Sequence, residues 1–586
     1  MEKKIKFINN YISALTPADG SKFDSNANVT QKTVATLEAE LFKEETIKIN
    51  RKRLYDKMVQ MFGVVDAEMF EQLQANHFVY VNDETSLKPY CASISLYPFI
   101  LEGTKCIGGV SSAPKNLQSF NGGFVNFVYQ VASNFAGAVA TVEYLKDFDY
   151  FARKTYGEDY LTTNKRDIIQ EFQGVVYAMN QPASARGDQS VFWNISIFDE
   201  FYFKEMFGEF FYPDGSQPKW ESVKALQKVF LEFFREERTK ALLTFPVVTV
   251  AMLTEEDTGE PRDKDLLELC ATEMSLGHSF FIYMSNKADS LSSCCRLRNE
   301  MEDNTFSYTL GAGGVSTGSF KVITLNMNRI SQDRLVKISG ILDVVYKALA
   351  SYRELFVELI EAGMLPAYTA GLVTLDRQFG TIGLNGVLEG FEYYSQYSEY
   401  DYKVYLVRLL SSITLSNKEA KEKYGFRFNT EFIPAENLGV KNAKWDKEDG
   451  WFVPRDCYNS YFYPVENDKL TILDKVNLHG KDVSVHLDGG SALHLNLDGL
   501  LSVEQAKQLF LLCGKHGVPY WTYNVLSTIC NDCEYIDPHT LQECSKCGSK
   551  NVDYGTRIIG YLKRITNFSS PRQKEAHSRA YHKVNV

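Results

Sequence analysis

Apolar residues recur at helical spacing through the first eighty residues of the chain. In residues 30–47 and 51–78 they fall near i, i+3, i+4 and i+7, which places them on one face of a helix. Residues 78–83, FVYVND, then form a short strand-like run that ends at Asn-Asp. The pattern predicts a helical N-terminal region over residues 1–80.

From residue 81 to residue 524, strand and helix patterns alternate. β-type runs occur in residues 190–199 and 244–253, and a glycine-rich loop leads into a strand in residues 311–330. A helical run follows in residues 338–365. Strands that alternate with helices over such a length predict an α/β fold, built as a mostly parallel sheet or barrel.

Two stretches of this region carry local expectations. Residues 118–157 start near a Gly-Gly pair and predict one long helical run, whose small residues would let another helix approach closely. Residues 290–300, SLSSCCRLRNE, are short and polar and predict a loop.

Composition narrows the class of protein. The 586 residues are 44% hydrophobic and 23% charged, which is typical of a folded globular chain. The net charge of −11 argues against a protein that coats nucleic acid, because such proteins usually carry a basic surface. The N-terminus has no continuous apolar segment of a signal peptide, and the longest apolar run, residues 241–253, is too short to span a bilayer. We therefore expect a cytoplasmic protein with no membrane association.

Four of the eleven cysteines are clustered near the C-terminus. The stretch CNDCEYIDPHTLQECSKCGS has two C-x2-C pairs separated by ten residues, a spacing that places four thiolates around one tetrahedral Zn²⁺. Four unrelated thiols, or a redox pair, are poorer explanations of this spacing. We predict a zinc ribbon over residues 525–550 with these ligands: Cys530, Cys533, Cys544 and Cys547.

A glycine in an apolar stretch follows the ribbon. Gly560 lies in GTRIIGYLKRIT, with isoleucine before it and tyrosine after it. Taken alone, a packing or turn glycine is the ordinary explanation, and a chemical role is the other. The ribbon, in turn, is compatible with a rigid base for this loop or with a nucleic-acid-binding module.

RIIGYL close behind a four-cysteine ribbon resembles the C-terminus of the anaerobic (class III) ribonucleotide reductases, which are glycyl-radical enzymes. Further stretches are similar to that family in family order, over about residues 25–582. They are FDSNANV, PYCASISL, NGGFVNFVYQVASNFAGA, AMNQPASARGDQSVFWNISIFD, SCCRLRNE, GAGGVSTGSFKVITLNMNRI, FIPAENLGVK and SSPRQKEAHSRAYHK.

The resemblance implies an α/β barrel of ten strands, made of two parallel five-stranded halves. It divides the chain into the helical region 1–80, a catalytic barrel over 81–524, the ribbon over 525–550 and a glycyl-radical loop with a tail over 551–586. A finger loop near residues 290–297 enters the barrel. The implied activity is anaerobic reduction of ribonucleoside triphosphates to deoxyribonucleoside triphosphates for DNA synthesis, with an allosteric homodimer.

The resemblance also implies roles for three residues. Gly560 would store a glycyl radical, because its Cα can flatten and delocalise the unpaired electron, and an alanine would crowd that planar centre. Cys295, which directly precedes an arginine, is favoured over Cys294 as the thiyl radical that takes the ribose 3′ hydrogen. Cys91 corresponds to the second active-site thiol, with a buried core thiol as the alternative.

The chain departs from part of the family at Ser319, where formate-using members carry asparagine. This departure favours a thioredoxin- or glutaredoxin-like dithiol as reductant over formate. Glu436 and Asn437, in the motif PAEN, resemble a substrate-binding loop that holds the ribose hydroxyls. Without the resemblance, PAEN is a plain turn and Ser319 an ordinary loop serine.

Cofactors and partners follow from the same resemblance. We expect Mg²⁺ with the nucleotide, and dNTP or ATP effectors at a specificity site. The family likeness begins too early for an N-terminal ATP cone, so we expect no dATP shut-off through one. The sequence has no C-x3-C-x2-C cluster, so the radical requires a separate activating enzyme with S-adenosylmethionine and a [4Fe–4S] cluster. The alternatives are a glycyl-radical lyase of the pyruvate formate-lyase type, whose relatives usually lack a ribbon, and a zinc-ribbon nucleic-acid-binding protein.

Overall fold

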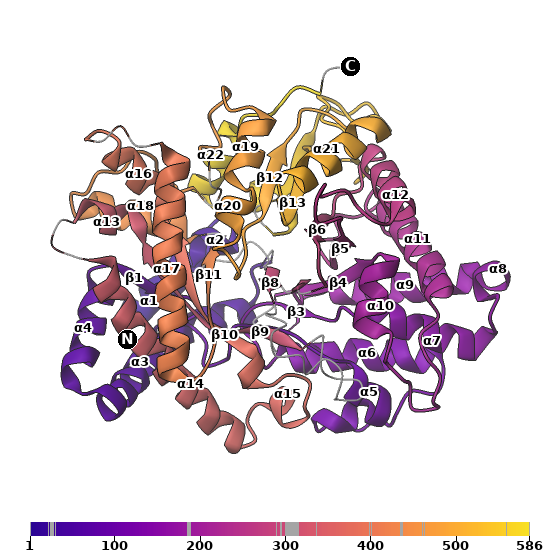
Figure 1. Ribbon diagram of the computed structural model, residues 1–586, viewed down its shortest axis with the longest axis horizontal. Coiled ribbons are helices and arrows are strands. Elements are labelled where there is room, and N and C mark those ends of the chain that lie inside the picture. Colours follow the sequence, from indigo (N-terminus) through magenta and orange to yellow (C-terminus); the bar gives the residue numbers. More distant parts are fainter. Residues whose placement is uncertain are drawn as a thin grey trace.

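A computed structural model describes most of the chain and places ten of its strands in one barrel (Figure 1). The described residues are 2–21, 23, 29, 31–183, 189–288, 290–292, 296–298, 316–333, 335, 337–397, 399, 401–433, 437–459, 461, 463–557 and 560–584.

Helices form the N-terminal region, as the sequence predicts. They are α1 (Glu2–Ser13), α2 (Pro17–Gly20), α3 (Val34–Phe62) and α4 (Val64–Ala75). A capping box between Thr33 and Thr36 starts α3. Helices α3 and α4 pack against α14 (Ile338–Glu361), and the Lys57 ammonium lies 2.5 Å from a Glu358 carboxylate oxygen across that contact. The N-terminal region is therefore attached to the outside of the barrel.

Ten strands form two parallel halves. The first half runs in the order β2 (Cys91–Ser93), β3 (Val139–Ala140), β4 (Trp193–Phe198), β5 (Val247–Leu253) and β6 (Phe281–Ser285). The second comprises β9 (Thr317–Asn326), β10 (Gln378–Asn385), β11 (Phe428–Phe432), β12 (Leu493–Asn496) and β13 (Tyr520–Asn524).

Antiparallel pairs join the two halves, β2 with β9 and β6 with β13. The circle closes where Glu431 of β11 forms a parallel bridge with Gly490, three residues before β12. A short strand, β1 (Val79–Val81), pairs with β9 beside the barrel path. The predicted ten-stranded barrel of two parallel halves is confirmed.

Helices surround the barrel (Figure 1). Those that follow the first-half strands are α5 (Tyr97–Glu102), α6 (Leu117–Ala132), α7 (Tyr144–Tyr156), α8 (Tyr160–Thr163), α9 (Lys165–Met179), α10 (Glu200–Phe207), α11 (Trp220–Glu237) and α12 (Lys264–Ser275). The second half adds α13 (Met327–Gln332), α14, α15 (Pro366–Thr369), α16 (Val387–Tyr394), α17 (Tyr402–Tyr424), α18 (Leu438–Glu448), α19 (Ile472–Leu478), α20 (Lys481–Ser484) and α21 (Val503–Lys515). Among the helices of the described part, none combines the length and apolarity that a membrane crossing requires.

Two local expectations were wrong. The run 118–157 is not one helix: α6 ends at Ala132, β3 occupies Val139–Ala140, and α7 starts at Tyr144. Strand β3 is buried on both faces and has two residues, so it offers no alternation for a sequence pattern to detect. The predicted loop at 290–300 contains two paired strands, β7 (Ser290–Ser292) and β8 (Arg296–Arg298).

The C-terminal residues form a second, smaller sheet. Its strands are β15 (Ile536–Asp537), β14 (Ser527–Cys530), β16 (Val552–Arg557) and β17 (Leu562–Arg564) in spatial order, and α22 (Ser570–Ser578) follows. Strand β14 lies in the predicted ribbon segment and β16 in the predicted radical-loop segment, so the two segments share one sheet.

Candidate active site

Gly560 lies in the turn of a β-hairpin. Strands β16 and β17 pair antiparallel, and their last partners are Arg557 and Leu562. The intervening residues form the tip, of which Ile558 and Ile559 lie outside the described part and Gly560 is half-buried. The hairpin therefore carries Gly560 next to the paired ends of β16 and β17.

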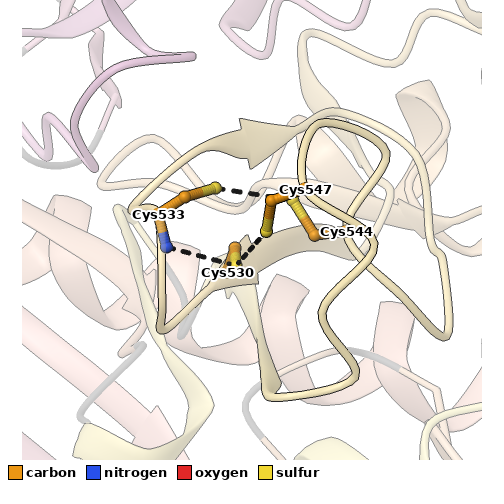
Figure 2. Close-up of side chains that lie close together, drawn as sticks. All are labelled: Cys530, Cys533, Cys544 and Cys547. Carbon is orange, nitrogen blue, oxygen red and sulfur yellow. Dashed lines mark hydrogen bonds between the residues drawn. The ribbon is translucent and has the colours of Figure 1, made fainter.

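The four ribbon cysteines converge at the base of this hairpin (Figure 2). Their sulfur atoms all lie within 4.8 Å of one another, and the Cys530–Cys547 and Cys533–Cys544 sulfur pairs are both 3.6 Å apart. A tetrahedral Zn²⁺ with 2.3 Å bonds requires sulfur atoms about 3.8 Å apart. The donor set and its spacing therefore fit zinc.

The ribbon and the hairpin are joined by the pairing of β14 with β16. Cys530 ends β14 and is the register partner of Val552, the first residue of β16. From Val552 the strand runs without interruption to Arg557, next to the tip. The ribbon is also attached to the barrel side, because the Ile536 amide donates to the Thr239 carbonyl at 3.0 Å. A metal at the cysteines would thus stiffen the base on which Gly560 is carried.

The space around Gly560 would accept a side chain. An added Cβ would meet, among described neighbours, only the Phe192 ring, at an ordinary contact distance of 3.6 Å. Tyr561 packs edge-on against Phe192 with 5.3 Å between ring centroids, and it also contacts Phe245. The described surroundings of the unactivated backbone therefore leave room for a methyl group, and the expectation that an alanine would crowd the planar radical centre stays a prediction. Among the described residues, no packing contact requires a glycine at this position.

Arg557 reaches from β16 to the glycine that follows it in the tip. Its Nη1 donates to the Gly560 carbonyl oxygen at 3.3 Å, its Nη2 donates to Ser279 Oγ at 2.9 Å, and its guanidinium lies 4.4 Å from the centre of the Phe281 ring. Only 2% of the residue is exposed. Burial lowers the pKa of Arg557 to about 10, so the group stays charged at neutral pH.

Strand register identifies the side chains that face the barrel interior. Trp193 packs against Phe124 of α6 and Tyr144 of α7, so it faces outward. Its neighbour Asn194 therefore faces inward. Asn194 is the register partner of Ala140, and Ala140 is the register partner of Ser93, so Ser93 also faces inward. Because side chains alternate along a strand, Cys91 shares the inward face with Ser93.

The interior is unusually rich in polar atoms that no described residue pairs. These atoms belong to side chains that are at least nine-tenths buried, and a hydrogen bond to each is missing within the described part of the chain. They are Ser93 Oγ, Asn194 Nδ2, Thr249 Oγ1, both Asn429 amide atoms, Asn496 Nδ2 and Asn524 Oδ1. Each such atom costs about 1–3 kcal/mol if it stays unpaired. Their convergence from six strands onto one interior fits a polar ligand held there.

Cys91 and Ser319 meet on the seam between the halves. They are direct register partners on β2 and β9. Cys91 is 1% exposed, and Ser319 Oγ lies 2.7 Å from Thr381 Oγ1. The Cys91 carbonyl accepts a hydrogen bond from Gln378 Nε2 at 3.1 Å. Cys91, the predicted second thiol, and Ser319, where formate-using members carry asparagine, are thus neighbours.

The other predicted residues are only partly placed. Cys294, Cys295 and Glu436 lie outside the described residues. Asn437 is described: it occupies the N-cap position of α18 without a side-chain capping bond, and its Oδ1 accepts a hydrogen bond from Ser569 Oγ at 3.3 Å. The substrate-loop motif therefore contacts the segment that follows the glycine hairpin.

Sequence reasoning missed several of these residues. Arg557 is the first residue of the RIIGYL motif and no role of its own was predicted for it, although an arginine three residues before the glycine is a usable signal. The inward asparagines, such as Asn194 and Asn429, lie in strands that are otherwise apolar. An amide in such a strand is a detectable signal for a buried polar site.

A barrel of two parallel five-stranded halves, whose polar interior is approached by a glycine-bearing hairpin, is the architecture of the glycyl-radical enzymes. Within that class, the family model for anaerobic ribonucleoside-triphosphate reductases matches residues 38–582, and the chain belongs to this family.

Solved structures agree with this assignment. One, described as an anaerobic ribonucleotide reductase, is 28% identical with a TM-score of 0.85, over 99% of this chain and 92% of that chain. Two structures of the Thermotoga maritima anaerobic ribonucleotide reductase, one with dATP in the specificity site and one with dATP and CTP, have TM-scores of 0.83 and 28% identity, over 97% of this chain and 94% of theirs. No curated protein matches the sequence.

The chain is thus an oxidoreductase that reduces ribonucleoside triphosphates under anaerobic conditions. The glycyl-radical lyase and the nucleic-acid-binding protein, the two alternatives that the sequence left open, are not favoured. The four-cysteine cluster, which the lyases usually lack, agrees with the reductase assignment.

Proposed function

We propose that Gly560 stores the radical of this reductase and that Cys295 and Cys91 act on the ribose from opposite faces. One observation carries the proposal: the described residues leave room for a side chain at Gly560, yet a glycine stands there at a hairpin turn with a buried guanidinium on its carbonyl. A glycine that no described packing contact requires is best explained by chemistry at its Cα, which the Cys295 thiol would approach.

The proposed steps move hydrogen atoms, protons and single electrons. Gly560 Cα, once it has lost a hydrogen atom, takes one from the Cys295 thiol, which leaves a thiyl radical. The thiyl radical takes the 3′ hydrogen of the ribose, and the 2′ hydroxyl then leaves as water with a proton from Cys91. Loss of water leaves a radical at the 2′ carbon and a carbonyl at the 3′ carbon, with the 3′ hydroxyl proton on Glu436. The dithiol gives one hydrogen atom to the 2′ carbon and one electron to the 3′ carbonyl, which takes its proton back from Glu436 and becomes a 3′ radical. The second dithiol proton restores the Cys91 thiol. Finally, Cys295 gives the 3′ hydrogen back, and Gly560 is restored as the radical.

The ribose would be held at the mouth of the polar interior. Glu436 and Asn437 are proposed to hydrogen-bond its hydroxyls, and the carboxylate of Glu436 would take the 3′ proton. The Asn437 contact with Ser569 supports this role, because it joins the substrate loop to the segment after the glycine hairpin. Mg²⁺ would accompany the triphosphate, as it usually does with nucleotides.

The proposed reductant is a dithiol protein of the thioredoxin or glutaredoxin kind. Overall, one ribonucleotide and one dithiol give one deoxyribonucleotide, one disulfide and water, which balances atoms and electrons. Ser319 supports this choice, because a hydroxyl bonded to Thr381 stands beside Cys91 where formate-using relatives carry an amide.

The remaining partners are proposed from the family. A separate activating enzyme with S-adenosylmethionine and a [4Fe–4S] cluster would remove the Gly560 hydrogen atom. Deoxynucleotides or ATP would bind a specificity site in a homodimer, as the Thermotoga maritima enzyme binds dATP there. We place the protein in the cytoplasm.

Anaerobic activation followed by electron paramagnetic resonance tests the proposal. The expected result is a glycyl doublet in the wild type that is absent from Gly560→Ala. A properly activated sample without a doublet would refute the radical role of Gly560.

A further inference from the structure

Arg557 is one of two buried arginines that adjoin each other behind the glycine tip. Arg579, in the segment after α22, is 4% exposed and donates from Nη1 to the Arg557 carbonyl at 3.0 Å. Its charge is balanced, because Nε lies 2.9 Å from a Glu575 carboxylate oxygen. The hydrogen bond from Arg579 to the Arg557 carbonyl therefore holds the backbone of Arg557 in place.

Arg557 itself has no such balance. Within the described part of the chain no carboxylate forms an ion pair with it, and its partners are a carbonyl, a hydroxyl and a ring face. A buried cation normally has a counter-ion, because desolvation costs several kcal/mol. An arginine that is kept charged, buried and unbalanced is therefore held there for the group that it contacts. Of its three partners, only the Gly560 carbonyl belongs to the reacting centre.

A glycyl radical responds to its carbonyl. The unpaired electron on Cα is stabilised by donation from the amide nitrogen and by withdrawal toward the carbonyl. A charged donor on the carbonyl oxygen strengthens the withdrawal, and a low-dielectric site makes that hydrogen bond stronger than it is in water. The same bond restrains the peptide group of the tip, which must stay flat for delocalisation.

We propose that Arg557 is a positioning residue of the radical store: its guanidinium binds the Gly560 carbonyl oxygen, draws spin density toward that carbonyl and holds the tip in register. This inference rests on the proposed role of Gly560. It assigns Arg557 a function that is separate from substrate binding, so its loss should affect the lifetime of the radical and the turnover number while the KM for the nucleotide stays unchanged.

The test uses the full-length, zinc-loaded protein, labelled with [1-¹³C]glycine and activated anaerobically by a radical S-adenosylmethionine activating enzyme. The carbonyl ¹³C hyperfine coupling and the radical half-life are measured for the wild type, Arg557→Met and Arg557→Lys. The matched control is Arg564→Met, because Arg564 lies on the same hairpin but bonds to Asn531 at 2.8 Å.

Arg557→Met should lower the carbonyl coupling and shorten the half-life by at least about tenfold, the effect of losing a charged hydrogen bond. Arg557→Lys keeps the charge but not the planar donor. Its carbonyl coupling and radical half-life should lie between those of the wild type and those of Arg557→Met. Arg564→Met should match the wild type. If a change in zinc content shows that Arg557→Met misfolds, the test is the comparison of Arg557→Lys with the wild type.

Wild-type coupling and half-life in the folded Arg557 variants would overturn the inference while leaving the role of Gly560 intact. A wild type without any doublet would instead overturn the proposed function, so the two failures are distinguishable.

Discussion

Cys91 and Ser319 are direct partners across the antiparallel seam where the two halves of the barrel meet. A strand pair of this kind holds opposed Cβ atoms roughly 4.5–5.5 Å apart. Whatever replaces Ser319 therefore lies beside the Cys91 thiol. The seam combines the proposed proton donor with the position that distinguishes this chain from its formate-using relatives.

Cys91→Ser should abolish turnover while leaving the radical in place. The thiol is proposed to deliver a proton to the leaving hydroxyl, and loss of such a donor typically costs about 10²–10⁴-fold in rate. Deoxynucleotide formation and the intensity of the glycyl doublet are measured on the same activated sample. The control is Cys513→Ser, since Cys513 is a buried thiol of α21. If Cys91→Ser retained wild-type turnover, Cys91 would be a core thiol.

Gly560→Ala should remove the radical without weakening the fold. Among the described residues the added methyl meets only Phe192, at 3.6 Å, so the free energy of unfolding should change by no more than about 1 kcal/mol. Denaturant unfolding checks the stability, and paramagnetic resonance checks the radical.

Exposure to air gives a second readout of the same variant. Oxygen should cut the activated wild type at Gly560, so mass spectrometry should find a fragment that begins there, and Gly560→Ala should stay whole. A fragment that appears equally in both would place the radical elsewhere.

Loss of the ribbon metal should reduce the radical yield before it affects the barrel. Because Cys530 pairs with Val552 at the base of the hairpin, an unfolded ribbon releases the strand that carries the tip. Cys547→Ser should lose bound zinc and show a weak doublet, while far-ultraviolet circular dichroism of the barrel stays close to wild type. Cys106→Ser, in the half-buried 3₁₀ turn after α5, is the control. Full radical yield without zinc would show that the ribbon does not support the tip.

Turnover should follow a dithiol protein and not formate. With the activated enzyme and CTP, reduced thioredoxin should sustain deoxynucleotide formation, and formate alone should give only background. Ser319→Asn is the informative variant, because it restores the amide of the formate-using relatives beside Cys91. Formate-driven turnover by the wild type would contradict the assignment of the reductant.

The stability of the protein should fall between about pH 6.5 and pH 4 through His479. Burial lowers the pKa of this side chain to about 4, from an ordinary value near 6.5. In this range the unfolded chain therefore binds a proton at His479 that the folded chain does not bind, so the free energy of unfolding decreases as the pH falls. At pH 5 the cost is about 2 kcal/mol.

Urea unfolding at pH 7 and pH 5 measures this effect. His479→Gln should have a smaller loss between the two values than the wild type, and His577→Gln, an exposed change in α22, should not. Equal losses in all three proteins would remove His479 as the cause.

The sequence by itself determined the parts that depend on local spacing. Two C-x2-C pairs specify a metal site because four thiolates at that separation have few other uses, and Cys530 and its partners do converge. The long periodic helix at residues 338–365 and the apolar strand at 244–253 were also predictable, since each repeats its pattern over several turns or residues. The order of the family-like stretches indicated the barrel and the reductase activity.

Only the tertiary structure decided which distant residues meet. Strand β3 is too short and too completely buried to leave a periodic signal, yet it places Asn194 and Ser93 on one interior face. The pairing of Cys91 with Ser319 depends on closure of the barrel, which brings β2 against β9 across more than two hundred residues of chain. Arg557 is three residues from Gly560 in sequence, but the lack of an ion pair between it and any described carboxylate is a property of the packed interior. Spacing along a chain fixes ligands and periodic faces, whereas burial and charge balance exist only once the segments are assembled.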